Sequence, residues 1–359
     1  MDKRTVVIVG ITGSIGTQAL EVIQKINGFQ VIAGTYHSNQ KLAEQIANKF
    51  KIDKMIRTSE GYDEIISQIE KLRPDITIVA IPGFASLPIT LKAIENSNRV
   101  LLASKEALVC GGWLVKNALK NSSTELLPVD SEHSALMQLL EDGTEKILLT
   151  CSGGALRDWN IDGLHDAKPT DVLRHPVWNM GHKITVDSAT MVNKGFEVLE
   201  AYELFNIDVS KIEVLLHKEG LIHAGVFLKD GTMKLHMGFP DMKVPIAYAL
   251  TYPKRDYSKM EWPDLSLVNL SFYPVDAKRY PAFFLAYEIA KDYAKRTAYN
   301  AADEVAVESF LSGKIKFTDI NKVIERVLEK IDGTPRDLSD LTQLDKLARR
   351  LALEVIECL

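Results

Sequence analysis

The start of the chain places a strand, a glycine turn and a helix in succession, and this order restricts the fold more than any other feature. Residues 6–9 form a short apolar strand, Gly10, Gly13 and Gly16 punctuate a G-x-x-G-x-x-G turn, and an amphipathic run covers residues 18–26. Glycines let a backbone approach a pyrophosphate, and a helix N-terminus offers unpaired N–H groups and the positive end of its dipole. The order therefore predicts a dinucleotide-binding unit.

Strands and helices keep alternating as far as residue 129. We expect helices at residues 40–50, 62–72 and 87–96, and strands at residues 30–35, 54–57, 75–81, 99–103 and 125–129. Near-continuous apolar strands separated by helices are typical of a parallel sheet covered on both faces. The chain is therefore predicted to be an α/β protein whose first part is a Rossmann-like parallel sheet.

The loop after the second expected strand bears on the choice of dinucleotide. An NAD enzyme usually places an acid about 20 residues beyond the glycines, where it holds the ribose 2′-hydroxyl. This loop carries no acid and instead offers His37, Ser38, Asn39 and Lys41. These side chains suit a 2′-phosphate and favour NADPH over NADH, and the equally weighted alternative is a solvated loop without a role.

Composition and charge exclude several classes of protein. With 359 residues, two or three domains are expected, and 46% hydrophobic and 25% charged residues are ordinary for a globular chain. A net charge of -5 argues against a nucleic-acid partner, and the longest apolar runs are strand-sized, which argues against a membrane. The start lacks a signal-peptide pattern, and Cys110, Cys151 and Cys358 are too scattered for a disulfide framework or zinc site. We therefore expect a cytoplasmic protein.

A pair of carboxylates follows the last strand of the predicted sheet. Asp130 and Glu132 flank Ser131, and His133 comes next. Two carboxylates at this spacing can bind one metal ion. A third carboxylate from elsewhere in the chain, together with water and substrate oxygens, would complete an octahedral Mg²⁺ or Mn²⁺ site. The alternative is a helix N-cap with a polar first turn, and one segment can serve both purposes.

Residues 174–200 hold the densest group of polar side chains. Ser188, Thr190 and Asn193 precede Lys194, and Glu197 follows three residues later. Hydroxyl, amide and ammonium donors suit a phosphate-bearing substrate, and the carboxylate suits a hard metal ion beside it. We expect a strand at residues 183–186 within this stretch, and the alternative is a loop, a strand and a helix with ordinary surface polar groups.

The rest of the chain predicts a central domain and a helical end. Strand-like runs at residues 212–217, 221–228 and 232–238 surround Asp230-Gly231, which is a hairpin signal, and such antiparallel strands often form a dimer interface. Four prolines give residues 252–281 the composition of a linker. Helical periodicity follows at residues 283–295, 301–311, 319–330 and 341–356. The predicted parts are a cofactor domain (1–148), a central α+β catalytic and dimerisation domain (149–252), a linker (253–282) and a C-terminal helical bundle (283–359).

Seven motifs together resemble one family. They are GITGSIG (10–16), LLASKEALV (101–109), LLPVDSEH (126–133), SGGALR (152–157), HPVWNMG (175–181), VDSATMVNKGFE (186–197) and TAYNAADEVAV (297–307). In this order they resemble the 1-deoxy-D-xylulose 5-phosphate reductoisomerases, and the resemblance runs essentially end to end. It implies rearrangement of the carbon skeleton of a small phosphorylated sugar, 1-deoxy-D-xylulose 5-phosphate, by retro-aldol cleavage and re-addition. Reduction with NADPH to 2-C-methyl-D-erythritol 4-phosphate would follow, with Mg²⁺ or Mn²⁺ as the ion, Co²⁺ being a further alternative, in a homodimer.

The resemblance also implies roles for single residues, each read from a matching motif position. Cofactor contacts fall on Thr12, Gly13, Ser14 and Ile15, with Ser104, Glu106 and Gly181 further along the chain. The metal ligands are Asp130, Glu132 and Glu197, so the third carboxylate is Glu197. Substrate contacts fall on Lys105, Ser131, Glu132, Ser152, His175, Trp178, Ser188, Asn193, Lys194 and Glu197. Lys105, His175 and the three metal ligands are the catalytic group, and Trp178 and Met180 lie in a mobile lid.

Two other classes fit part of the pattern. A semialdehyde or homoserine-type NADP dehydrogenase would explain the N-terminal half and the phosphate donors, but it needs no metal site of three carboxylates. A non-enzymatic dinucleotide sensor would explain only the glycine loop. The chain also departs from the family pattern at Tyr36 to Asn39, at Ser104, where Asn is usual, and at residues 217–220.

Overall fold

The computed structural model describes residues 3–59, 61–178, 180–258 and 261–359. The chain divides into two compact units. Unit 1 comprises Met1–Ala107, Trp113–Ser134 and Asp241–Glu261, and unit 2 comprises Leu108–Gly112, Ala135–Pro240 and Trp262–Leu359. Each unit is described by itself below.

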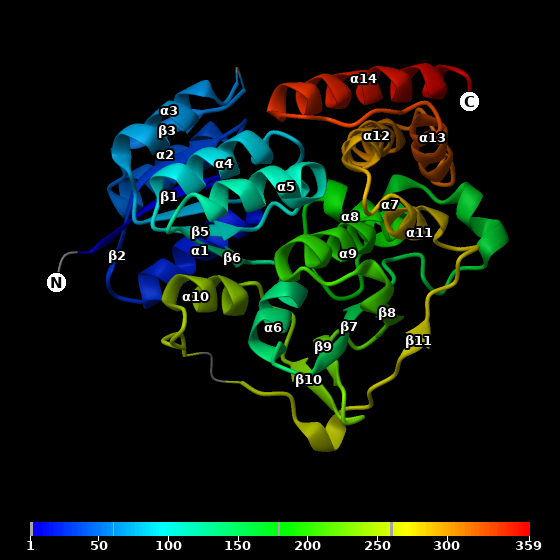
Figure 1. Ribbon diagram of the computed structural model, residues 1–359, viewed down its shortest axis with the longest axis horizontal. Helices are drawn as coiled ribbons and strands as arrows, with labels where there is room; N and C mark the ends of the chain where they lie inside the picture. The colour runs from blue at the N-terminus through cyan, green and yellow to red at the C-terminus, as the bar shows by residue number, and fades with distance from the viewer. Residues whose placement is uncertain (1–2, 60, 179, 259–260) are drawn as a thin grey trace. The chain divides into compact units, whose positions relative to one another are not determined.

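Unit 1 is built on a six-stranded sheet with the order β3-β2-β1-β4-β5-β6, in which every pair is parallel. The strands are β1 (Arg4–Val9), β2 (Phe29–Tyr36), β3 (Lys54–Arg57), β4 (Ile76–Val79), β5 (Arg99–Leu102) and β6 (Glu125–Pro128). Figure 1 draws this sheet and its helices from blue to cyan. From β1 the chain adds strands first on one side (β2, β3) and then, from β4 on, on the other. Ligands of such sheets bind outside the carboxyl ends of the strands, at the point between β1 and β4 where this direction changes. The predicted Rossmann-like parallel sheet is confirmed.

The helices of unit 1 cover this sheet because each has one apolar face. They are α1 (Ser14–Lys25), α2 (Gln40–Phe50), α3 (Asp63–Leu72) and α4 (Ser86–Asn96), followed by α5 (Glu106–Lys120) and α6 (Ser131–Leu139), which extend beyond unit 1. Buried residues of α1, such as Ala19, Leu20 and Ile23, recur at helical spacing. All four residues of β4 are buried, as a central parallel strand requires.

A segment far along the chain belongs to unit 1. Helix α10 (Lys243–Thr251) lies within this unit, whereas the sequence predicts one central domain over residues 149–252. Arg99 at the start of β5 donates to the carbonyl oxygens of Ala249 (3.1 Å), Leu250 (3.2 Å) and Tyr252 (3.1 Å). One guanidinium thus caps the free carbonyls at the end of α10.

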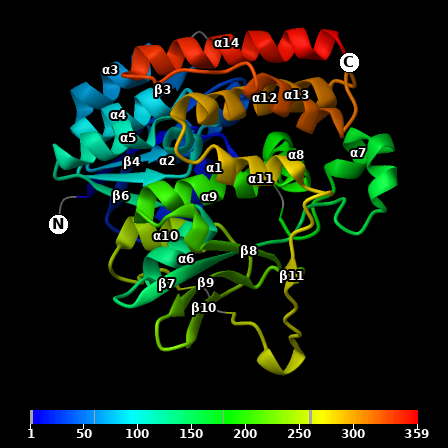
Figure 2. The same ribbon diagram turned by 45° about the vertical axis from the view of Figure 1, so that its right-hand side comes forward.

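Unit 2 contains a five-stranded mixed sheet with the order β10-β9-β7-β8-β11. The strands are β7 (Thr144–Cys151), β8 (Ile212–Leu216), β9 (Ile222–Leu228), β10 (Met233–Met237) and β11 (Tyr273–Pro274). The predicted hairpin joins β9 to β10: Gly231 has φ +84°, and Asp230 Oδ1 accepts from the Thr232 amide at 3.0 Å. β11 pairs with β8, so the segment predicted as a linker contributes a strand, while its residues 259 and 260 lie outside the described residues. Figure 2 shows this sheet below the helices of the same unit.

Unit 2 also holds the C-terminal helices. These are α11 (Pro281–Glu288), α12 (Tyr293–Leu311), α13 (Asp319–Leu328) and α14 (Leu338–Glu357), which confirms the predicted helical end. The helix expected over residues 283–295 is interrupted, because α11 ends at Glu288 and α12 begins at Tyr293, capped by Asp292. In the described part of the chain, no helix is both long and apolar enough to cross a membrane.

The strand predicted at residues 183–186 is wrong. Those residues lie in α8 (His182–Thr190), and α9 (Val192–Phe205) follows after Met191, which has φ +60°. The helix is favoured locally because Lys183 and Asp187, one turn apart, form an ion pair of 2.6 Å. Thr185 Oγ1 also donates to the Gly181 carbonyl at 2.8 Å in the first turn.

Candidate active site

The glycine turn of unit 1 has the tight geometry that a dinucleotide requires. Gly10 has φ +92°, and a Cβ there would lie 2.3 Å from the Ala80 carbonyl oxygen. A Cβ on Gly16 would lie 2.3 Å from the Gly10 carbonyl oxygen. The cofactor residues predicted in this turn lie at the start of α1, with Gly13 as N-cap and Ser14 and Ile15 in the first turn after Thr12. Gly13 and Ser14 are exposed, and the Gly13 amide donates to the Gly10 carbonyl at 3.0 Å, so Ser14 is the better candidate of the two to offer its N–H to a phosphate.

The predicted 2′-phosphate residues lie directly after β2. His37, Ser38 and Asn39 are all exposed. Asn39 also has a structural role, since its Oδ1 accepts from the Leu42 amide at 3.1 Å as the N-cap of α2. Of these three residues, His37 and Ser38 are therefore stronger candidates than Asn39 for contact with a 2′-phosphate.

Two residues at the end of β5 shape the neighbouring loop. Ser104 is buried, and its hydroxyl donates to the Val79 carbonyl (3.2 Å) and accepts from the Ile81 amide (3.0 Å). Glu106 Oε1 accepts from the Gly83 amide at 2.9 Å. Both side chains hold the turn after β4, and their direct contact with a cofactor stays a prediction.

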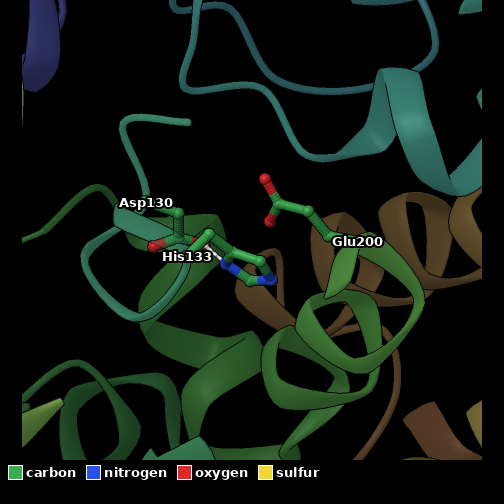
Figure 3. Close-up of side chains that lie close together, drawn as sticks. All are labelled: Asp130, His133 and Glu200. Carbon is green, nitrogen blue, oxygen red and sulfur yellow. Dashed lines mark ion pairs between the residues drawn. The ribbon is translucent and has the colours of Figure 1, made fainter. Parts of the chain in front are cut away.

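Polar residues gather where β6 ends and α6 begins. The Lys105 ammonium forms an ion pair with Asp130 Oδ2, and Ser131 Oγ donates to Glu132 Oε2 at 2.5 Å. His133 Nδ1 lies 3.8 Å from Asp130 Oδ2, the pair joined by the dashed line in Figure 3. Asp130 Oδ1 also accepts from the Ser131 amide at 3.0 Å at the start of α6, which fits the alternative of a polar first helical turn, while the metal site stays a prediction.

Unit 2 brings together the predicted phosphate residues on α9. Asn193 Nδ2 donates to Glu197 Oε1 at 2.6 Å, and the Lys194 ammonium forms an ion pair with Glu197 Oε2. Lys194 is only 3% exposed and Glu197 1%. A buried ammonium and carboxylate are held in place by each other, which keeps both in a defined orientation.

The turn after β7 lies against α8. A Cβ on Gly154 would lie 2.7 Å from the Ser188 carbonyl oxygen and 2.5 Å from Ala189 Cα. Ser152 Oγ accepts from the Gly154 amide at 3.3 Å and lies 3.1 Å from His175 Nε2. Ser152, His175 and the Ser188 backbone are therefore neighbours within unit 2, as residues of one substrate site must be.

His175 also organises the predicted lid. Its Nδ1 accepts from the amides of Val177 (3.2 Å) and Trp178 (2.8 Å). A neutral imidazole with Nδ1 as acceptor carries its proton on Nε2, so Nε2 donates to Ser152 Oγ. Trp178 is half-buried and Gly181 exposed, while Asn179 lies outside the described residues.

We expect His175 to stay neutral between pH 5 and 8. Burial, followed by the nearby Arg157 guanidinium, lowers the pKa of His175 from 6.5 to about 4. In the unfolded chain, His175 would bind a proton below about pH 6.5, whereas in the folded chain it does so only near pH 4. His175 therefore lowers the free energy of unfolding as the pH drops from about 6.5 to about 4. Imidazole resonances, assigned by comparison with His175→Gln, would show no midpoint between pH 5 and 8. A midpoint near 6.5 would contradict the buried neutral imidazole.

Two residues of this site were missed by the sequence analysis. Arg157 Nη1 donates to the Ser152 carbonyl at 2.8 Å, and Tyr280 Oη donates to the Gly153 carbonyl at 2.9 Å. Arg157 belongs to the SGGALR motif, which was a usable signal. No local signal pointed to Tyr280, since it comes from a distant part of the chain.

The strand order, the glycine turn and the acidic and basic side chains described above define a dinucleotide-binding oxidoreductase class. A model of 1-deoxy-D-xylulose 5-phosphate reductoisomerase matches residues 6–60 and 53–112. A model of its C-terminal domain matches residues 126–205, and one of the DXP reductoisomerase C-terminal domain matches residues 237–351. The chain belongs to the 1-deoxy-D-xylulose 5-phosphate reductoisomerase family.

Relatives and solved structures agree with this assignment. The chain is 65% identical over its full length to the whole 1-deoxy-D-xylulose 5-phosphate reductoisomerase of Pseudothermotoga lettingae, and 51% identical to that of Thermotoga neapolitana, covering 100% of this chain and 99% of the relative. A crystal structure of DOX-P reductoisomerase in complex with NADPH, fosmidomycin and magnesium matches with a TM-score of 0.91 and 32% identity, over 99% of this chain and 98% of the other. The Zymomonas mobilis enzyme in complex with NADPH matches with a TM-score of 0.88 and 35% identity, over 100% of both chains. The semialdehyde-type and sensor alternatives are therefore set aside.

Proposed function

We propose that this chain is an NADPH- and divalent-metal-dependent enzyme. It converts 1-deoxy-D-xylulose 5-phosphate to 2-C-methyl-D-erythritol 4-phosphate, in the synthesis of isoprenoid precursors. Family membership supports the reaction, and similar structures hold NADPH and magnesium. The observation that carries the proposal furthest is the buried Lys194 on α9. Its ammonium is paired with Glu197, which also accepts from the Asn193 side-chain amide, so a fixed positive charge and an amide donor are held by the same carboxylate.

The phosphate end of the substrate would be held within unit 2. Lys194 supplies a point charge, and Asn193 and Ser188 supply neutral donors beside it. Fixing this end orients the reacting carbons with binding energy taken from a part of the molecule that does not react. His175, through Nε2–H, and Ser152 would contact the sugar hydroxyls.

Asp130, Glu132 and Glu197 would hold the metal ion. Their donor atoms are carboxylate oxygens, which suit Mg²⁺ or Mn²⁺. The residues fit such a group within each unit: Asp130 lies between β6 and α6 and Glu132 in the first turn of α6, and Glu197 is held by two donors. When bound, the ion would supply Lewis-acid polarisation of the substrate carbonyl.

Lys105 would act beside Asp130. Its ammonium forms an ion pair with Asp130. With substrate bound, the ammonium would donate a hydrogen bond to a substrate hydroxyl and hold or transfer a proton there. NADPH, when bound at the glycine turn, would supply the hydride. Trp178 and Met180 would close over the substrate and exclude water from the aldehyde formed after bond cleavage.

Lys194→Ala is expected to weaken substrate binding by about 1.5–3 kcal/mol, the value of a hydrogen bond to a charged group. The KM for 1-deoxy-D-xylulose 5-phosphate should then rise roughly 10- to 100-fold. Lys211→Ala, at an exposed lysine of the same unit, provides the control. Unchanged KM and kcat in Lys194→Ala would remove this residue from the site.

The assembly and the location of the protein remain proposals. We propose a homodimer, supported by exposed apolar side chains of unit 2, of which Trp262 is 83% exposed, Leu267 80% and Leu265 69%. Single exposed apolar residues are common, but a group of this size often marks an interface. Sedimentation of the wild type and of Leu267→Glu would test it, and a wild-type monomer at working concentration would contradict it. The cytoplasmic location and the boundaries of the three functional domains stay predictions.

Identification of the product tests the function itself. Incubation with substrate and NADPH should give a branched-chain polyol phosphate, visible as a new methyl singlet by proton NMR. A reduced but unbranched product would point to simple carbonyl reduction and would contradict the proposed rearrangement.

A further inference from the structure

A buried ionic cluster in unit 2 involves α8 and the motif of residues 297–307, for which the reaction above gives no role. Lys183 Nζ lies 2.6 Å from Asp187 Oδ2 on the same helix and 2.5 Å from Asp303 Oδ2 on α12. Asp303 is fully buried and Asp187 is 3% exposed. Charges removed from water are tolerated only in close, well-aligned pairs, so the contact fixes the helices that carry it.

The same face of α12 contacts α9. The Lys183 ammonium lies 5.4 Å from the centre of the Phe196 ring, and Phe196 meets Tyr299 of α12 edge-on, with ring centroids 5.2 Å apart. Gly195 permits this approach, because a Cβ there would lie 2.9 Å from the Tyr299 hydroxyl oxygen. Helix α12 therefore contacts both α8, through Lys183, and α9, through Phe196.

These two helices carry the proposed phosphate-binding side chains. Ser188 lies on α8 with Lys183, and Asn193 and Lys194 lie on α9 next to Gly195. A phosphate needs its donors at fixed distances, since hydrogen bonds weaken steeply when their geometry is poor. Any rotation of α8 against α12 would move Ser188 relative to Lys194.

We propose that Lys183 and Asp303 are positioning residues for the phosphate end of the substrate. Their ion pair holds α8 against α12 and so fixes the spacing of the donors on α8 and α9. This inference rests on the proposed function, which makes the phosphate-bearing sugar the substrate.

Steady-state kinetics of Asp303→Asn test the inference. The KM for 1-deoxy-D-xylulose 5-phosphate should rise about tenfold, because small displacements of binding groups are costly. The KM for NADPH should stay within about twofold, since the glycine turn belongs to unit 1. The inhibition constant of inorganic phosphate, used as a competitive inhibitor, should rise by a factor similar to the rise in KM for the sugar. Asp345→Asn is the matched control, because Asp345 is a buried acid of α14 that bonds Arg349 on its own helix at 2.8 Å.

A second variant covers the case in which Asp303→Asn does not fold. Lys183→Met with Asp187→Leu and Asp303→Leu replaces all three members of the cluster by apolar side chains of similar size, because removing only two of them would leave a buried carboxylate without its lysine. Raised KM for the sugar and weaker phosphate inhibition in this folded variant would support the inference. Wild-type values for both, in either folded variant of an active enzyme, would overturn it. Failure of the wild type to turn over the sugar would contradict the proposed function instead.

Discussion

Glu197→Gln should lose nearly all turnover while the protein still binds NADPH. The substitution removes one proposed metal-ligand charge and changes little in volume. Metal ions contribute several kcal/mol to transition-state stabilisation, so kcat should fall about 100-fold or more. Steady-state rates and NADPH fluorescence titration measure the two quantities separately.

Glu213→Gln is the control for this change, since Glu213 is an exposed acid on β8 of the same unit. It should keep wild-type turnover. Asp130→Asn should repeat the result of Glu197→Gln from unit 1, because both carboxylates are proposed to serve one ion. Retained turnover in both Glu197→Gln and Asp130→Asn would contradict the metal assignment.

Gly16→Ala should abolish most NADPH binding. The added Cβ would lie 2.3 Å from the Gly10 carbonyl oxygen and 2.6 Å from Ile11 Cα, so the turn must open. Overpacking of this kind costs about 1–3 kcal/mol, and the N–H groups that face the pyrophosphate move with the turn. The dissociation constant for NADPH should therefore rise roughly tenfold or more.

Gly163→Ala is the matched substitution, because a Cβ there meets no described atom within 4 Å. It should leave NADPH affinity unchanged. Thermal unfolding of both variants separates a local effect on the turn from loss of the fold. Wild-type NADPH affinity in Gly16→Ala would contradict the placement of the cofactor at this turn.

Local sequence patterns were enough to predict the parallel sheet of unit 1 and parts of unit 2. The strand, glycine turn and helix at residues 6–26 and the hairpin at Asp230-Gly231 depend on neighbouring residues and on backbone conformations that glycine permits. Asp130 and Glu132 were recognisable because a carboxylate pair follows a buried strand. The link to Glu197 came from the family resemblance, since no pattern along the chain joins residues so far apart.

Contacts between distant segments could not be predicted in this way. The Lys183 segment was expected to be a strand, yet its helix is stabilised by Asp187 one turn away and by Asp303 on α12. Helix α10 belongs to unit 1 partly because Arg99, which is distant in sequence, donates hydrogen bonds to the carbonyl oxygens at the end of this helix. Tertiary contacts of this kind override local propensity.

The oxidation of NADPH by the purified protein tests the central proposal most directly. It should be followed by the loss of NADPH absorbance with 1-deoxy-D-xylulose 5-phosphate present, with Mg²⁺ or Mn²⁺ added and again with EDTA. We expect oxidation that requires both the sugar phosphate and the metal. A folded protein that binds NADPH but oxidises none with either metal, or that oxidises it equally well in EDTA, would contradict the proposal.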